Sequence, residues 1–226
     1  MPGPSSWTPG LQAAAIYGNL GMFLLGYNTV VQNNSLLPLA EHFGLDATQR
    51  ELVSSLTVLF AAFASVFSPP LNANLGRRKM LLISAAFAVL GATCVLISRS
   101  FAFLLFGRSA LGIAAGLASN TAPMYLAELS PPEHRGIVVG LADFNAVAGQ
   151  LLASIVNTLC MRANPNGSWR FPMGIALAPA LLQLLGQATL PESPRWLMQR
   201  GLEGEAERVL QDMYGQVLST HPLIAP

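Results

Sequence analysis

Long stretches without any charged residue are the feature that most limits what this chain can fold into. Charged residues make up 10% of its 226 residues, whereas roughly 25% is usual in a soluble globular protein. A helix that crosses a lipid bilayer needs about 20 consecutive apolar residues. We therefore expect an all-α polytopic membrane protein with six transmembrane helices, at about residues 12–34, 52–71, 80–98, 103–126, 137–160 and 171–190.

The rest of the composition excludes several other classes of protein. A hydrophobic content of 52% is unlike that of a disordered chain, and a formal net charge of +1 provides no basic face for nucleic acid. The three histidines are not at the spacing of metal ligands, and no nucleophile–base pair stands out in the sequence. We therefore expect no enzyme activity, no cofactor, no metal site and no nucleic-acid partner.

The predicted spans divide the chain into three regions. Residues 1–10 form an N-terminal tail, residues 11–191 a six-helix transmembrane bundle, and residues 192–226 the start of linker helices. The tail contains no Lys or Arg, unlike a secretory signal peptide, so we expect the first apolar run to be retained. An even number of spans puts both termini on one side, and the basic cluster at positions 77–79 indicates the cytoplasm. We expect a multi-pass protein of the plasma membrane with both termini in the cytoplasm.

The sequence after Pro191 predicts a helix outside the membrane. Ser193 and Pro194 suit the first residues of a helix, with serine at the cap and proline in the first turn. Apolar residues then recur at helical spacing, at Leu202, Ala206, Val209, Leu210, Met213, Val217 and Leu218. Charged residues occupy the other face, so we expect an amphipathic helix on the cytoplasmic surface.

Ordered motifs at the predicted helix ends carry a family resemblance. Gly-Arg-Arg at 76–78 follows the second span, and Pro-Glu-Ser-Pro-Arg-Trp-Leu at 191–197 follows the sixth. Between them, residues 123–136 read Pro-x-Tyr-x-x-Glu-x-Ser-Pro-x-x-x-Arg-Gly, and Gly-Tyr-Asn at 26–28 lies in the first span. Over about residues 11–215 the chain resembles the amino-terminal half of a sugar porter of the major facilitator superfamily. That group contains facilitative glucose transporters and proton–sugar symporters.

The resemblance implies transport by alternating access, in which one half of the protein rocks against the other. It also implies a charge network that steadies the outward-facing state at the cytoplasmic helix ends, formed by Arg77, Arg78, Glu128, Arg135, Glu192 and Arg195. The alternative is that these charges only anchor the topology. The family often has Asp or Asn at the position of Ala73, so we expect a weaker network at that corner.

Polar residues form a stripe along the predicted fifth span. Asp143, Gln150 and Asn157 are spaced by seven residues, which places them within about 20° of one another around a helix. Polar residues inside a membrane face a cavity or the bundle interior rather than lipid. By resemblance, Gln150 matches a glutamine that contacts the sugar, and Asp143 replaces a second one, so the substrate need not be a plain hexose. The alternative is that the stripe makes hydrogen bonds that pack helices together.

Asn28 and Arg108 form a predicted coupling corner. Proton-coupled sugar porters tend to carry Asp at the position of Asn28, near an arginine that Arg108 matches. Since asparagine does not titrate, the resemblance implies facilitated diffusion of a sugar or a related polyol. Proton-coupled symport stays open, because Asp143 is a carboxylate that can carry a proton instead. Tyr27, Thr29 and Gln32 are further candidates for the wall of the same cavity, with packing as the alternative for the Tyr27 ring.

The resemblance covers one of the two halves between which such transporters hold their substrate. Three interpretations follow: a truncated carrier, a half-transporter that pairs with itself or another half, or a non-transporting partner that regulates a full carrier. The expected partners are the lipid bilayer, a small-molecule sugar, and either the missing second half or another chain bound by oligomerisation.

Overall fold

The computed structural model describes residues 9–130, 135–163 and 169–214, and every regular element in these ranges is a helix. The five long helices are α1 (Pro9–Phe43), α2 (Ala47–Leu75), α3 (Arg77–Ile97), α4 (Phe101–Leu129) and α5 (Arg135–Ala163). The four shorter helices are α6 (Arg170–Gly174), α7 (Leu177–Thr189), α8 (Pro194–Gln199) and α9 (Glu203–Tyr214). The predicted all-α fold class is confirmed.

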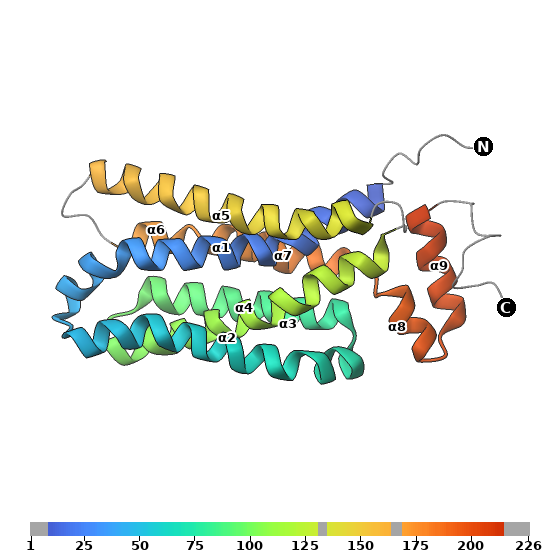
Figure 1. Ribbon diagram of the computed structural model, residues 1–226, viewed down its shortest axis with the longest axis horizontal. Coiled ribbons are helices and arrows are strands. Elements are labelled where there is room, and N and C mark those ends of the chain that lie inside the picture. The colour runs from blue at the N-terminus through green and yellow to red at the C-terminus, as the bar shows by residue number, and fades with distance from the viewer. Residues whose placement is uncertain (1–8, 131–134, 164–168, 215–226) are drawn as a thin grey trace.

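The helices α1 to α7 run side by side along the long axis of the molecule, and α8 and α9 lie together at one end (Figure 1). The helix α1 occupies a central place, because it packs against α5, α4 and α7. The helix α4 packs in turn against α2 and α3. Together, α1 and α4 therefore connect α5 and α7 with α2 and α3.

Five helical stretches in the described residues are long and apolar enough to cross a membrane. They are α2, α3, α4, the part of α5 up to Cys160, and the stretch Arg170–Thr189. The 35-residue α1 is not among them, since polar residues such as Asn19 and Asn28 lower its mean hydropathy. It nevertheless packs inside the bundle in the place of the first predicted span, so the arrangement is broadly consistent with six spans.

The predicted sixth span consists of two helices rather than one. Ile175 and Ala176 separate α6 from α7, although both keep right-handed helical dihedral angles. Pro179 has no N–H group with which to bond the Ile175 carbonyl. That carbonyl accepts a hydrogen bond from the backbone nitrogen of Ala178 at 3.2 Å. The proline thus explains the interruption, and the two helices continue in nearly the same direction.

Two glycines allow α4 to lie close against α2. A Cβ atom at Gly112 would overlap the carbonyl oxygen of Thr57, and one at Gly116 would overlap that of Ala61. Small residues four positions apart permit this kind of close approach between membrane helices. The backbone of α2 is thereby held directly against α4.

The chain after the sixth span begins a helix where the sequence predicts one. The Ser193 hydroxyl accepts a hydrogen bond from the backbone nitrogen of Trp196 at 3.3 Å, and Pro194 is in the first turn of α8. The predicted helix is nevertheless divided, because Gly201 adopts φ +74° and turns the chain into α9. A positive φ of this size is readily adopted by glycine.

The amphipathic pattern of α9 is confirmed for the residues that the structure describes. Ala206, Leu210 and Met213 are buried, whereas Leu202, in the turn before α9, is 41% exposed. Val217 and Leu218, which extend the predicted apolar face, lie outside the described residues.

The outward faces of α2 and α5 carry many large apolar side chains. Within the 18-residue stretch of each helix that is apolar enough to cross a membrane, 17% of the residues of α2 and 22% of those of α5 are buried. The corresponding shares are 50% in α3 and 56% in α4. The exposed apolar residues on these two faces include Val58, Leu59, Phe63, Val66, Phe144, Val147, Leu151 and Leu159. Such extended apolar surfaces need lipid or another protein surface to cover them.

Candidate functional site

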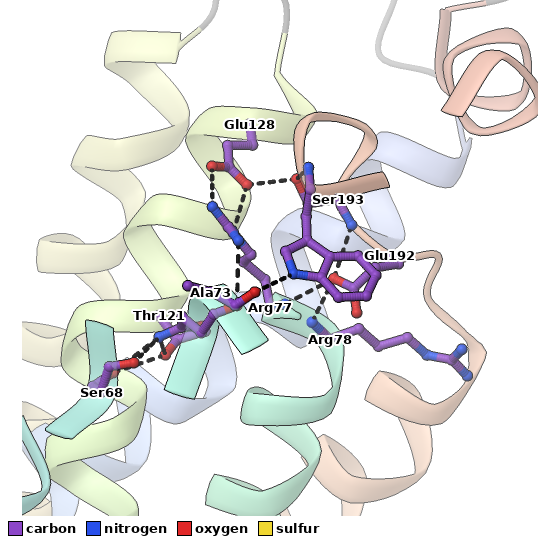
Figure 2. Close-up of polar contacts among 10 residues, drawn as sticks. Ser68, Ala73, Arg77, Arg78, Thr121, Glu128, Glu192 and Ser193 are labelled. Atoms are coloured by element: carbon purple, nitrogen blue, oxygen red, sulfur yellow. Dashed lines mark hydrogen bonds and ion pairs between the residues drawn. The ribbon is translucent and has the colours of Figure 1, made fainter. Parts of the chain in front are cut away.

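Three charged residues form a cluster at one end of the bundle, which we call the gate cluster. They are Arg77 at the start of α3, Glu128 near the end of α4, and Glu192 in the segment before α8. The Arg77 guanidinium donates two hydrogen bonds to the Glu128 carboxylate, from Nε at 2.9 Å and from Nη2 at 3.0 Å (Figure 2). The two side chains are only 9% and 8% exposed. A planar two-point contact of this kind fixes geometry more strictly than a single ion pair.

Glu192 is the second acidic member of the gate cluster, and it caps the first turn of α3. Its Oε1 atom accepts hydrogen bonds from the backbone nitrogens of Arg77 at 2.8 Å and Arg78 at 2.9 Å. The first N–H groups of a helix have no partner inside the helix, and they attract negative charge. The Glu192 carboxylate therefore stabilises α3 by binding the backbone N–H groups of that helix rather than an arginine side chain.

Gly76 makes this contact possible. It adopts φ +91°, and a Cβ atom at this position would overlap the Glu192 carboxylate. The first residue of the Gly-Arg-Arg motif and the acidic residue of the motif after the sixth span thus meet directly, although 115 positions separate Arg77 from Glu192 in the chain.

Ser193 links the two carboxylates of the gate cluster. Its hydroxyl donates a hydrogen bond to Oε2 of Glu128 at 2.5 Å, and its backbone nitrogen donates to Oε1 of Glu192 at 2.9 Å (Figure 2). Nearby, the Tyr125 hydroxyl donates to the carbonyl oxygen of Pro191 at 2.6 Å. The segment 191–193 therefore holds α3 and α4 together at this end of the bundle.

The side chains of three other residues predicted for the charge network make no described contact with a carboxylate. The Arg78 side chain donates to the carbonyl oxygen of Ala188. The exposed Arg135 donates from Nε to the carbonyl oxygen of Ala127 at 3.0 Å. Arg195 is exposed on α8. Within the described residues, the structure places Arg77, Glu128 and Glu192 together, and Arg77–Glu128 is their one salt bridge.

Trp196 and Arg200 form a second contact at this end of the bundle, which the sequence alone did not indicate. The indole nitrogen of Trp196 donates to the carbonyl oxygen of Ala73 at 2.9 Å. Nη2 of Arg200 donates to the carbonyl oxygens of Ala73 at 3.1 Å and Asn74 at 2.7 Å. These carbonyls belong to the last turn of α2, so Trp196 and Arg200 cap the end of that helix. At Ala73, where the family often has an Asp or Asn side chain, the contact is thus made by the backbone carbonyl.

A cavity of about 200 Å³ lies among α1, α2, α3, α4 and α7. Asn28, Thr29 and Gln32 line it from α1. Tyr27, the other residue predicted for this wall, is not among the lining residues, and its hydroxyl donates to the carbonyl oxygen of Pro172 at 2.6 Å. Asn28 donates to the carbonyl oxygen of Leu24 at 2.9 Å, and Thr29 donates to that of Leu25 at 2.8 Å. The cavity also has polar groups from other helices, including Ser84 and Gln183.

Arg108 is buried beside this cavity and is only 1% exposed. Nη1 of its guanidinium donates to Oε1 of Gln32 at 3.1 Å, and Nη2 lies 3.3 Å from the sulfur of Met173. Gln32 in turn donates to the carbonyl oxygen of Val53 at 3.3 Å. Asn28 bonds to its own helix instead, so the neutral Gln32 is the residue of α1 that contacts Arg108.

The polar stripe of α5 lies apart from this cavity. Asp143 and Gln150 are exposed on the face of α5 that also carries the large apolar side chains. Asn157 is half-buried, and its Oδ1 accepts a hydrogen bond from Ser35 of α1 at 3.5 Å. Asn157 thus makes the interhelical contact considered as the alternative for the stripe. Asp143 and Gln150 remain available to a surface that covers α5.

The amino-acid sequence matches the family described as "Sugar (and other) transporter" over residues 14–223. The chain is 38% identical over 201 residues to the proton myo-inositol cotransporter of Homo sapiens, covering 89% of the chain and 31% of that relative. It is also 38% identical to the D-xylose transporter of Levilactobacillus brevis, over 87% of the chain and 43% of the relative. The chain thus spans less than half the length of these relatives.

Solved structures match the fold closely. The proton:xylose symporter XylE of the major facilitator superfamily, bound to 6-bromo-6-deoxy-D-glucose, aligns with a TM-score of 0.85 at 27% identity, over 92% of the chain and 50% of that structure. The partially occluded inward-open form of XylE from E. coli aligns with a TM-score of 0.84 at 28% identity, over 92% of the chain and 56% of that structure.

Proposed function

The chain belongs to the sugar and other transporter family of the major facilitator superfamily, and from this premise we propose that it moves a sugar or a related polyol across a membrane by alternating access. Members of this family are multi-pass membrane transporters, not enzymes. The observation that carries the mechanism is the gate cluster of Arg77, Glu128 and Glu192. It joins helix ends by directional contacts, which break and form again when one half of a transporter rocks against the other.

The proposed substrate is rich in hydroxyl groups. Asn28 and Thr29 line the cavity, and Asp143 and Gln150 extend from the exposed face of α5. Amide and carboxylate groups are suitable partners for hydroxyls, which both donate and accept hydrogen bonds. Relatives named as transporters of myo-inositol, D-xylose and glucose support the same class of substrate.

We infer facilitated diffusion rather than proton-coupled symport. A coupling site needs a side chain that gains and loses a proton near the substrate. The residues described around the cavity include no carboxylate and no histidine. The described partner of Arg108 on α1 is the amide of Gln32, which neither gains nor loses a proton. Some relatives are named as proton-coupled, and Asp143 is the residue of this chain that would take over such a role.

Reconstituted uptake tests both the substrate class and the coupling. The native full-length protein that contains these residues would be placed in liposomes with an internal pH indicator, and D-xylose, D-glucose and myo-inositol would be supplied outside. We expect saturable entry of at least one of them until its internal and external concentrations are equal, with no change in internal pH. Acidification in a fixed ratio to sugar entry would establish symport instead. Absence of saturable entry for all three would contradict this substrate class.

We also propose that a second helical surface covers the exposed faces of α2 and α5 and completes the substrate site. Large apolar side chains there flank the polar Asp143 and Gln150, which suits an interface that also borders an aqueous pathway. Either further polypeptide of a full carrier or another chain can provide this surface. The orientation proposed is one with both termini in the cytoplasm of a plasma-membrane protein, since Arg77, Arg78 and Lys79 lie together at one end.

One observation also favours a second role, that of a non-transporting partner of a full carrier. The uncovered α2 and α5 faces would bind the complementary half of such a carrier. Coexpression separates the two roles, because a regulatory partner reduces or alters the flux of the full carrier and contributes no sugar flux when reconstituted alone.

A further inference from the structure

Two glutamines of α7 are buried without a partner for their side chains. Gln183 is 1% exposed and Gln187 is 0% exposed. In the described part of the chain, neither the nitrogen nor the oxygen of either amide has a hydrogen-bond partner. Buried polar groups are almost always hydrogen-bonded in native proteins, to the protein, to water or to a ligand. Each of these amides therefore requires an explanation.

Only Gln183 of this pair lines the cavity. A Cβ atom added at Gly21 of α1 would lie 2.9 Å from the amide nitrogen of Gln183 and 3.0 Å from the Cβ of Ala118 on α4. The amide end of Gln183 thus occupies a narrow space between α1 and α4, which the absence of a side chain at Gly21 keeps open. Gln187, one helical turn further along α7, is not among the residues that line the cavity.

Several of the other polar groups around the cavity already have partners. The amide nitrogen of Asn28 donates to Leu24. Gln32 accepts from Arg108 and donates to Val53. The Ser84 hydroxyl donates to the carbonyl oxygen of Ala114 at 2.9 Å. Among the described residues that line the cavity, Gln183 is the one whose side-chain nitrogen and oxygen are buried without a partner, and its amide offers two donors and one acceptor oxygen.

We propose that Gln183 is a specificity-determining residue, whose side-chain amide binds one hydroxyl group of a sugar or polyol that enters the cavity between α1 and α4. This proposal rests on the transport function proposed above and adds a contact from the sixth span to it. A hydroxyl matches the amide in either direction of donation. A buried amide placed to bind a hydroxyl rejects analogues that lack this hydroxyl, because the amide is then left unpaired.

Two matched substitutions test this role in the native full-length protein. Gln183→Met and Gln187→Met each remove an equally buried, unpartnered amide from the same helix and replace it with an unbranched side chain of similar length. Affinities for D-xylose, D-glucose, myo-inositol and their monodeoxy analogues would be measured by equilibrium binding. We expect Gln183→Met to weaken binding of the best substrate by about tenfold or more, and Gln187→Met to leave the affinity unchanged.

The monodeoxy analogues distinguish a direct contact from altered packing. One analogue, lacking the hydroxyl that Gln183 binds, should have the same affinity for Gln183→Met and for the unmodified protein. Thermal unfolding without sugar reports whether each variant is folded. If Gln183→Met fails to fold, Gln183→Asn, which retains the amide but withdraws it by one methylene group, should show a smaller loss with the same analogue pattern.

Several results would overturn the proposal. Equal affinities of the unmodified protein and Gln183→Met for every sugar would mean that water or packing alone satisfies the amide. Equal losses in both methionine variants, or a loss for all analogues alike, would mean a general effect on the bundle. In these cases the unmodified protein still binds and transports sugar. Absence of binding and transport by the unmodified protein would instead contradict the proposed function itself.

Discussion

The absence of a side chain at Gly76 determines whether two distant motifs can meet. The positive φ of Gly76 and the close approach of Glu192 both exclude a Cβ atom. Glu192 then reaches the first N–H groups of α3, where a negative charge is favoured. The glycine and the two arginines that follow it therefore have different roles, since Gly76 admits the carboxylate, whereas Arg77 binds Glu128 through its side chain.

Replacing Gly76 tests this arrangement. We expect Gly76→Ala to destabilise the protein by about 1–3 kcal/mol, because an L-residue at this φ is strained and its Cβ displaces Glu192. The control is Gly140→Ala in α5, where a new Cβ meets no atom within 4 Å and helix propensity favours alanine. Thermal unfolding in detergent measures both variants. Similar unfolding temperatures for the two would contradict the account of Gly76.

The charge of Glu128 is expected to matter for transport more than for folding. Glu128→Gln preserves the shape of the side chain and keeps an oxygen that accepts a hydrogen bond from Arg77, but it removes the negative charge from the gate cluster. We expect a clear change in the rate of sugar flux with nearly normal yield of membrane protein. Arg135→Gln is the matched control, since Arg135 is exposed and its one side-chain contact within the described residues is with a carbonyl oxygen. A fall in yield with unchanged flux per molecule would favour a topology-anchoring role.

Asp143 is expected to influence which sugar is preferred. Its carboxylate is exposed on α5, and an ionised carboxylate accepts hydrogen bonds from hydroxyls but donates none. Asp143→Gln supplies a donor as well, so we expect altered relative affinities among D-xylose, D-glucose and myo-inositol, with normal membrane insertion. Competition uptake by the native full-length protein measures this preference. Unchanged affinities for all three sugars would remove Asp143 from the substrate site.

At the scale of elements, α8 is too short to be stable without contacts to the bundle. It spans six residues, whereas isolated helices shorter than about 12–15 residues are marginal in water. Trp196 and Arg200 attach it to the last carbonyls of α2. Because Ser193, at its other end, contacts Glu128, α8 connects α2 with α4 and is placed to transmit movement between them.

Loss of the Arg200 contact should release α8 while leaving the bundle intact. We expect Arg200→Ala to increase amide hydrogen exchange in α8 and in the last turn of α2, and to leave exchange in α4 unchanged. Arg195→Ala is the matched control, because Arg195 lies within α8 but is exposed and has no described side-chain contact. If amide hydrogen exchange in both variants is the same as in the unmodified protein, Arg200 does not attach α8 to α2.

The elements that could be predicted from sequence are those set by local rules. Charge-free runs gave the helices of the bundle, and Ser193 and Pro194 gave the start of α8. The turn at Gly201 was missed, because it depends on the backbone geometry of a single residue. The partner of Arg108 was also missed, since hydrogen bonding through Gln32, one turn after Asn28, depends on how α1 and α4 pack. No local sequence pattern predicted a role for Gln183, since its burial becomes evident only once α7 packs against α1.

At the scale of the whole molecule, two surfaces have opposite character. The gate cluster and α8 tie together one end of the bundle by directional polar contacts, whereas α2 and α5 present uncovered apolar faces along its length. An alternating-access transporter needs both, because polar contacts at the helix ends hold one state until they break, and apolar faces let the bundle move against a partner surface. Asp143 and Gln150, at the uncovered face, are therefore expected to contact substrate only when this partner surface is in place.

Accelerated counterflow tests the central claim, transport of a sugar by alternating access, most directly. Liposomes containing the native full-length protein would be loaded with unlabelled sugar and placed in a trace of the same sugar with a radioactive label. We expect the labelled sugar to rise inside above its external concentration and then fall, because a carrier exchanges one sugar for another across a single site. Simple equilibration without this overshoot, or no entry of label, would contradict the account.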